Sequence, residues 1–239
     1  MKAYHIFLLL IALTFNWACA QTSGNEATYL ESIKIELHRK WPNNRTINLV
    51  FHGHSVPTGY FETPNVNTLG SYPYLTLNNV KKIFPFAVLN SITTSIGGEQ
   101  SEQGAERFGE EVLTHRPDVL FIDYALNDRG IGLERAKKAW KKMIEEAIAY
   151  GTKVILMTPT PDLREDILSP NSELANHSGQ IRQLAEKYKI GLVDSYMLFQ
   201  EIAKAEDLKI YMAQSNHINE KGHQVVANAI LDFFSLKSK

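Results

Sequence analysis

Apolar residues along this chain form short runs that alternate with longer stretches of helical periodicity. The runs are rich in β-branched and aromatic residues and are largely apolar on both faces, which is typical of buried strands. The intervening stretches repeat apolar residues every three or four positions, as amphipathic helices do. The predicted strands occupy 47–51, 87–92, 119–124, 154–157 and 191–193, and the predicted helices occupy 28–40, 107–114, 133–150, 172–188 and 222–234.

Strands that alternate with helices over short connections predict a parallel sheet covered by helices on both sides. No linker, repeat or low-complexity segment divides residues 21–239, so we predict one α/β domain there. Open sheets of this kind bind ligands at the carboxyl ends of their strands. The polar residues that directly follow the strands are therefore the candidates for chemistry.

The first twenty residues have the pattern of an export signal. Lys2 lies in a mildly basic start, residues 6–15 are apolar apart from one threonine, and Ala18 and Ala20 flank Cys19 as in a small-residue cleavage site. Cys19 has two interpretations, because it is either removed with the signal or is the lipid-bearing first residue of a bacterial lipoprotein. No later stretch is long and apolar enough to predict a transmembrane helix. We therefore predict a secreted or periplasmic protein, with a lipid anchor in the second case.

Composition and charge narrow the range of partners. The chain is 44% apolar and 21% charged, and a single cysteine in 239 residues excludes a disulfide scaffold or a zinc ribbon. A net charge of −1 provides neither the basic surface that nucleic acids need nor a polybasic segment for anionic lipids. We therefore expect a small or neutral molecule, or another protein, as the partner, and no nucleic acid or cofactor.

Candidate catalytic residues follow three of the predicted strands, and one more precedes the last helix. Ser55 lies on a turn after the first strand, where a hydroxyl projects into a cleft but needs a base to become a nucleophile. His217, in a loop near the C-terminus, is the candidate base. Gly98 and Asn127 are candidate donors to an oxyanion, through backbone and side chain. Taken singly, Ser55 and Asn127 are explained as turn caps and His217 as a structural histidine.

Taken together, these residues resemble the motif blocks of a known superfamily. Gly53-His54-Ser55-Val56, Gly98, Asn127-Asp128 and His217 occur in the order and at about the spacing of the four blocks of the SGNH, or GDSL-type, hydrolases. The resemblance implies a three-layer α/β/α fold with a flavodoxin-like parallel sheet of about five strands. It also implies a nucleophilic Ser55, a basic His217, and an oxyanion hole formed by Ser55, Gly98 and Asn127. The superfamily contains esterases, lipases, thioesterases and carbohydrate deacetylases.

The sequence departs from the usual blocks at three positions. His54 replaces an aspartate in the first block, Ala125 replaces a glycine in the third, and Gln214 stands where the triad acid lies three residues before His217. Losing that acid costs serine proteases about 10⁴-fold in rate. Three explanations stay open: a carbonyl of Gln214 holds the histidine, a carboxylate from Asp128 or Asp162 replaces the acid, or the activity is lost.

His52 and His54 form a His-x-His pair, which raises the alternative of a mononuclear metal site that uses His52 or His54 with His217 and His223. The binuclear pattern requires a further Asp-His just downstream, and this chain lacks it there. We therefore predict no metal. We expect His54 instead to pack beneath the serine turn and to hold loops together by hydrogen bonds.

The segment from Tyr60 to Tyr74 is rich in aromatic residues, which either stack on sugar rings or pack in the core. Glu62, Glu99 and Arg129 lie near strand ends and are candidate contacts to a polar substrate. We predict a serine esterase that removes a small acyl group, acetyl as in the carbohydrate deacetylases, from a small-molecule or polysaccharide ester. The alternatives are a lipid esterase or thioesterase of the same fold, and a catalytically impaired glycan-binding protein.

Overall fold

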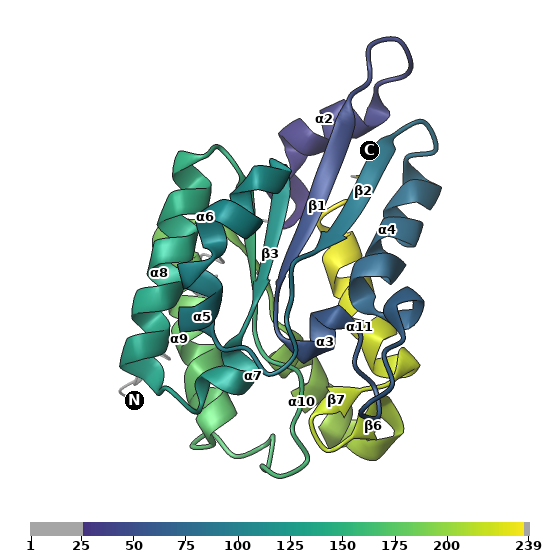
Figure 1. Cartoon of the computed structure of the whole chain (residues 1–239). Helices are drawn as coiled ribbons and strands as arrows, with labels where there is room; N and C mark the ends of the chain where they lie inside the picture. Colours follow the sequence, from purple (N-terminus) through teal and green to yellow (C-terminus); the bar gives the residue numbers. More distant parts are fainter. Residues whose placement is uncertain (1–25, 237–239) are drawn as a thin grey trace, which may run out of the picture.

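A five-stranded parallel sheet forms the centre of the molecule, as a computed structural model shows for residues 26–236 (Figure 1). The strand order is β2-β1-β3-β4-β5, with all pairs parallel. The predicted signal at residues 1–20, including Cys19, lies outside the described residues. The strands are β1 (Thr46–Gly53), β2 (Val88–Thr93), β3 (Val119–Asp123), β4 (Lys153–Met157) and β5 (Gly191–Val193).

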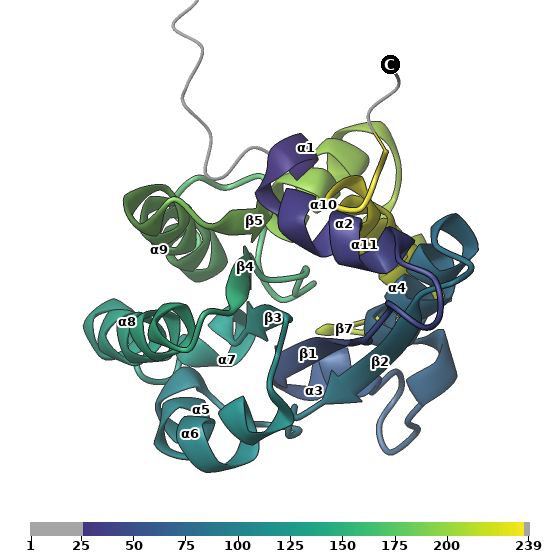
Figure 2. The ribbon, with the colours of Figure 1, turned by 90° about the horizontal axis from the view of Figure 1, so that it is seen from above.

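Helices cover both faces of this sheet (Figure 2). Alternate residues of the strands supply two separate cores, because successive side chains point to opposite faces. Phe51 and Phe121 belong to one core, and Val50 and Leu120 belong to the other. The first core contains α2 (Glu31–His38), α4 (Tyr72–Ile83), α10 (Ser195–Ala205) and α11 (Glu220–Asp232), and the second contains α5 (Ser101–Glu106), α6 (Phe108–Glu111), α8 (Leu133–Ala149) and most of α9 (Glu173–Tyr188). The predicted three-layer α/β/α fold is confirmed.

Short elements gather at the carboxyl edge of the sheet, below the strands in Figure 1. One-turn helices follow β1 and β3 directly, and a two-stranded antiparallel ribbon precedes α11. This edge is where open parallel sheets bind ligands. The elements are α3 (Ser55–Thr58), α7 (Ala125–Asp128), β6 (Met212–Gln214) and β7 (His217–Ile218); α1 (Glu26–Tyr29) and the 3₁₀ turns Thr68–Gly70, Leu113–His115 and Leu208–Tyr211 complete the described chain.

The observed helices differ more from the predicted ones than the five strands of the central sheet do. The predicted helix 107–114 is wrong in extent, since α5 ends and α6 begins on either side of Arg107, and the first helix is interrupted at Leu30. Neither α4 nor α10 was predicted. The buried face of α4 includes Thr76 between Tyr72 and Val80, so its periodicity is partly polar and does not stand out. Within residues 26–236 no helix has the length and hydrophobicity needed to cross a membrane.

Gly53 allows β1 and β3 to approach closely where β1 ends. A Cβ at this position would lie 2.3 Å from the Asp123 carbonyl oxygen and 2.9 Å from Pro57 Cγ, both of which are held by the surrounding backbone. The loop that carries Ser55 therefore depends on a residue without a side chain at position 53.

We predict that Gly53→Ala lowers the free energy of unfolding by roughly 1–3 kcal/mol, because the extra methyl group overpacks a rigid site. Gly179→Ala is the matched control, since a Cβ there meets nothing within 4 Å in the interior of α9. That control should raise the free energy of unfolding by roughly 0.5–1 kcal/mol. Urea denaturation measures both, and a Gly53→Ala protein as stable as the wild type would contradict the packing argument.

Candidate active site

Ser55 is presented by a tight turn at the carboxyl end of β1. It is the first residue of α3, and the preceding His54 caps that helix by accepting a hydrogen bond from Val56 N at its Nδ1, 3.2 Å away. Gly59 ends the helix with φ of +97°, a conformation that glycine adopts without strain. Ser55 is 6% exposed, so its hydroxyl lies in a recess rather than on an open surface.

His217 contacts the Ser55 hydroxyl from the opposite end of the chain. The distance between His217 Nε2 and Ser55 Oγ is 2.9 Å, and His217 Nδ1 lies 2.9 Å from the carbonyl oxygen of Phe61. A carbonyl can only accept, so Nδ1 carries the proton in the neutral ring and Nε2 is left to accept from Ser55. This is the tautomer that a general base for serine requires.

The Gln214 side chain makes no hydrogen bond to the His217 ring, although the two residues pair across the β6–β7 ribbon, so the expectation that a Gln214 carbonyl orients the histidine is wrong in this structure. Its Oε1 accepts from Thr63 N at 3.0 Å, and its Nε2 donates to Asn216 Oδ1 at 3.1 Å. The partner of Nδ1 is a backbone group, on the loop that follows α3. Gln214 fixes that loop two residues beyond Phe61, and so acts on the histidine only through the backbone.

The two carboxylates considered as replacements for the acid are occupied elsewhere. Asp128 accepts from Ser101 N and Trp140 Nε1, both at 2.7 Å, and burial raises its pKa. Asp162 is paired with Arg129 and Arg164 at 2.6 Å. Although burial opposes it, hydrogen bonds from these arginines hold the pKa of Asp162 at about 2. Neither carboxylate is bonded to His217, so the substitute-acid hypothesis has no support in this structure.

The predicted oxyanion donors follow three neighbouring strands. Ser55 N lies in the first turn of α3, where helix amides have no partner in the helix. Gly98 lies in the loop after β2, with φ of +80°, and is exposed. Asn127 lies in α7 after β3, and its Nδ2 donates one hydrogen bond to the Glu99 carbonyl at 2.9 Å, which leaves its second amide hydrogen for a ligand.

His52 and His54 turn away from each other. His52 contacts Thr94 Oγ1 and the Gly104 carbonyl, whereas His54 Nε2 lies 3.3 Å from Asp123 Oδ1, close enough for attraction but not aligned as a hydrogen bond. The pair therefore does not form a shared ligand set. No group of three His, Cys, Asp or Glu side chains in residues 26–236 is arranged to hold a metal ion.

A buried polar chain extends from His54 to the base of the C-terminal helix. Asp123, beside His54, accepts from the Tyr72 hydroxyl at 2.9 Å, and Tyr72 N donates to His223 Nδ1 at 3.1 Å. The His223 ring packs edge-on against Phe61, whose carbonyl holds His217. The chain therefore links the serine turn, the end of β3 and the loop that orients the histidine.

The other residues predicted to contact a substrate are either engaged by other residues of the protein or lie beside Ser55 and His217. Glu99 is buried against Arg107, and Arg129 is paired with Asp162 and Glu165, so neither faces a ligand freely. Tyr72 is fully buried and cannot stack on a sugar. The Tyr60 ring lies 6.1 Å from the His217 ring and against Gly97, so it borders the recess.

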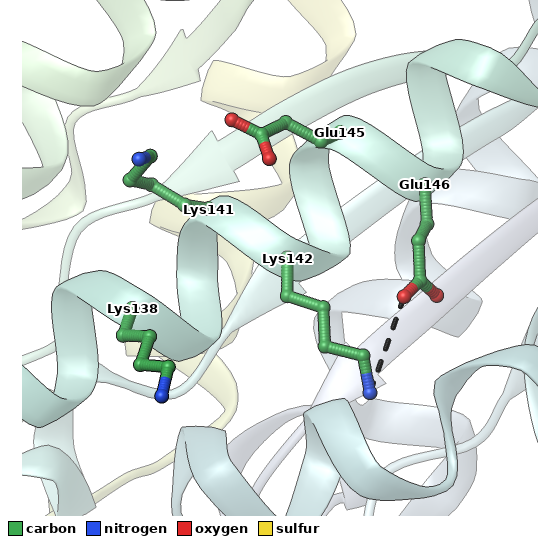
Figure 3. A pocket seen from close by; sticks show the side chains of 5 residues that line it. All are labelled: Lys138, Lys141, Lys142, Glu145 and Glu146. Atoms are coloured by element: carbon green, nitrogen blue, oxygen red, sulfur yellow. Dashed lines mark ion pairs between the residues drawn. The ribbon is translucent and has the colours of Figure 1, made fainter.

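A hollow on α8 lies on a different part of the surface. It is lined by side chains of this one helix, Lys138, Lys141, Lys142, Glu145 and Glu146 (Figure 3). Lys142 and Glu146 form an ion pair across one helical turn, at 4.0 Å. This is the solvated face of an amphipathic helix, so it is not the candidate active site.

A serine in contact with a histidine at the carboxyl edge of a parallel α/β/α sheet is the arrangement of a serine hydrolase. The chain belongs to the GDSL-like Lipase/Acylhydrolase family, whose pattern it matches over residues 51–225. The predicted SGNH/GDSL resemblance is thereby confirmed, and the protein is a hydrolase of carboxylic esters.

Three similar proteins illustrate this relationship. Axe2, an acetylxylan esterase from Geobacillus stearothermophilus, superposes with a TM-score of 0.70 at 20% identity, over 80% of this chain and 95% of its own. A two-domain esterase active on acetylated mannans gives a TM-score of 0.71 at 20% identity, over 89% of this chain and 53% of its own. The uncharacterized lipoprotein YqeF of Bacillus subtilis (strain 168) is 25% identical over 187 residues, 64% of this chain and 77% of its own.

The pH dependence of activity should report the unusual partner of His217. Burial lowers the pKa of His217 below 6.5, only partly offset by the Phe61 carbonyl, so the neutral base persists into mildly acidic solution. Gln214→Asp adds a negative charge nearby, which raises the His217 pKa and moves the acidic limb of kcat/KM to higher pH. The profile is measured on p-nitrophenyl acetate between about pH 4 and pH 9. Gln214→Asn is the matched neutral control, and equal profiles for both variants would contradict the prediction.

Stability should fall in acid because at least three histidines are buried in neutral form. Burial lowers the pKa of His52 and of His177 to about 4 and that of His223 to about 3. The unfolded chain therefore takes up protons first as the pH falls below 6.5, and stability is lost from there toward the folded pKa values. We predict that His223→Gln lowers the slope of the unfolding free energy against pH between about pH 6 and pH 4.5. The decrease should correspond to about one proton fewer taken up on unfolding. Urea unfolding measures this, with exposed His38→Gln as control; an unchanged slope for His223→Gln would refute it.

Proposed function

We propose that this protein is an exported esterase that removes a small acyl group, acetyl, from a carbohydrate, with Ser55 and His217 as a catalytic dyad. The observation that carries the proposal is the 2.9 Å contact between His217 Nε2 and Ser55 Oγ, in a ring whose Nδ1 is held by the Phe61 carbonyl. This contact joins residues 162 positions apart and places the base on the nucleophile.

The reaction has two halves. Ser55 Oγ attacks the ester carbonyl carbon while His217 Nε2 takes the hydroxyl proton, and the negative oxygen is stabilised by Ser55 N, Gly98 N and Asn127 Nδ2. The tetrahedral intermediate collapses, and His217 returns the proton to the departing sugar hydroxyl. Water then attacks the acetyl-serine with His217 again as base, which releases acetate and restores Ser55.

A backbone carbonyl replaces only part of what the usual acid does. The Phe61 carbonyl fixes the ring and its tautomer, but it has no full charge with which to stabilise the imidazolium. The aspartate of serine proteases is worth about 10⁴-fold, of which the tautomer is a large part. We therefore infer an active enzyme in which the base is correctly oriented but less strongly supported than in a complete triad.

The substrate class rests on three supports. Structural neighbours act on acetylated xylan and acetylated mannans. Ser55 is 6% exposed and the Tyr60 ring lies beside His217, which favours a short acyl group with a flat ring alongside. The pattern of residues 1–20 and a relative named as a lipoprotein favour export, with Cys19 as the residue for an anchor. A lipid esterase, a thioesterase and a glycan-binding protein without turnover are the alternatives for the test.

We predict acetate release from p-nitrophenyl acetate and acetylated xylan or mannan, reduced at least about 10³-fold in Ser55→Ala and in His217→Ala. Exposed Ser235→Ala is the matched control and should keep full activity. A p-nitrophenyl decanoate ester and an acetyl thioester distinguish the lipid esterase and the thioesterase. Release no higher than that of Ser55→Ala on every ester, with retained binding to the glycans, would replace the esterase by the binding protein.

A further inference from the structure

We propose that Glu99 and Arg107 act as a positioning pair for the loop that supplies the oxyanion donors. This inference rests on the proposed function, and concerns two residues that make no contact with Ser55 or His217. We call residues 94–100, between β2 and α5, the oxyanion loop. Both ends of this loop are fixed by the Arg107 guanidinium.

The oxyanion loop has one backbone hydrogen bond of its own near the donor, from Glu99 N to the Ile96 carbonyl at 3.2 Å. It contains no helix or strand, and a Cβ added at Gly98 would meet nothing within 4 Å. Its backbone bonds to the sheet lie at the start, where Thr94 N donates to the Phe51 carbonyl and Ile96 N to the Gly53 carbonyl. The glycines that follow provide no side chains of their own to fix the donor. The residue that fixes the end of the loop is therefore the one after Gly98.

Glu99 fixes that end with a buried carboxylate. It is 7% exposed, and Arg107 donates to it through two nitrogens, Nε to Oε1 at 2.7 Å and Nη2 to Oε2 at 2.5 Å. The Tyr124 hydroxyl donates to Oε2 at 2.7 Å. A buried carboxylate is tolerated only with such partners, and the two-pronged geometry fixes direction as well as distance.

The same residue connects two of the proposed donors. Its amide follows Gly98 directly, and its carbonyl accepts the hydrogen bond from Asn127 Nδ2 at 2.9 Å. A shift of Glu99 would therefore move the Gly98 N–H and release the Asn127 amide together. Because an oxyanion hole stabilises the transition state through donors that are already in place, such a shift should appear in kcat.

Arg107 also holds the other end of the loop. Its Nη2 donates to the Thr94 carbonyl at 2.7 Å, and the Thr94 hydroxyl contacts His52 Nδ1 at 2.9 Å. The His52 ring in turn lies 3.1 Å from the Tyr124 hydroxyl. Since every carboxylate oxygen of Glu99 is engaged, Glu99 is not placed to bind a sugar, and its effect on catalysis passes through the backbone.

The test compares an ester with the thionoester in which sulfur replaces the carbonyl oxygen. Sulfur is a poor hydrogen-bond acceptor, so the ratio of kcat/KM for ester over thionoester measures the oxyanion hole. Arg107→Lys keeps the charge but loses the fork, and Glu99→Gln keeps the shape but loses the charge. We expect each to lower kcat on the ester by about 10- to 100-fold, with KM nearly unchanged and the ratio falling in step.

Three further variants make the result decisive. Asn127→Ala, which removes a proposed donor directly, should lower the ratio as well, and Tyr124→Phe, which removes one bond to Glu99 and leaves the ion pair, should lower it less. Arg182→Lys is the matched control, because Arg182 forms a similar two-pronged pair with Asp194 after β5, at the edge of the sheet away from β2. It should leave the ratio unchanged.

The outcomes separate the two proposals. A loss of folded protein lowers the rates on both esters equally, so an active wild type whose Arg107→Lys and Glu99→Gln variants keep the wild-type ratio would overturn the positioning pair alone. A wild type that turns over neither the ester nor the thionoester would overturn the proposed function, and the positioning pair with it.

Discussion

The hydrogen bond between His217 Nδ1 and the Phe61 carbonyl is the constraint on which the site depends. It brings the loop after α3 onto the ribbon before α11, so the serine turn and the histidine share one rigid unit. A backbone acceptor is less adjustable than a side chain, because it can be aimed only by folding its whole loop. Two contacts hold the loop that carries the Phe61 carbonyl: Tyr60 pairs with Val66 across it, and Gln214 accepts a hydrogen bond from Thr63 N.

A buried polar chain next to this bond fixes the relative positions of the elements that carry the site. His54 caps the serine helix and faces Asp123, Tyr72 joins Asp123 to His223, and His223 packs against Phe61. Every member of the chain comes from a different element, so displacing one element misaligns buried polar groups and deprives them of their partners. The oxyanion side is held separately, by the pair of Glu99 and Arg107. The two networks meet at the end of β3, where Asp123 belongs to one and Tyr124 to the other.

The sequence permitted the sheet and its layers to be predicted, because buried strands leave a local pattern. The pairing of Ser55 with His217 was predicted from the resemblance of the motif blocks to the SGNH hydrolases. The sequence did not permit prediction of the partner of His217, since a backbone carbonyl exists at every residue and has no sequence signature. The two carboxylates predicted as replacements, Asp128 and Asp162, are instead bonded to Trp140 and to arginines. Glu99 was placed near a strand end correctly, but its burial depends on Arg107, eight residues later at the junction of α5 and α6, where the predicted helix is wrong in extent.

Two departures from the usual family blocks change which groups hold the serine turn and the base. Asp123 is 2% exposed and lies 3.3 Å from His54 Nε2, so the histidine at position 54 reaches the end of β3. The same ring caps α3 through Nδ1, so one side chain joins the serine turn to the sheet. At the base, Gln214 bonds to Thr63 N, and the Phe61 carbonyl holds His217 Nδ1 in place of an acid. The His217 ring is thus oriented by a dipole rather than by a full charge, which fixes the tautomer that accepts from Ser55 but gives the imidazolium weaker support.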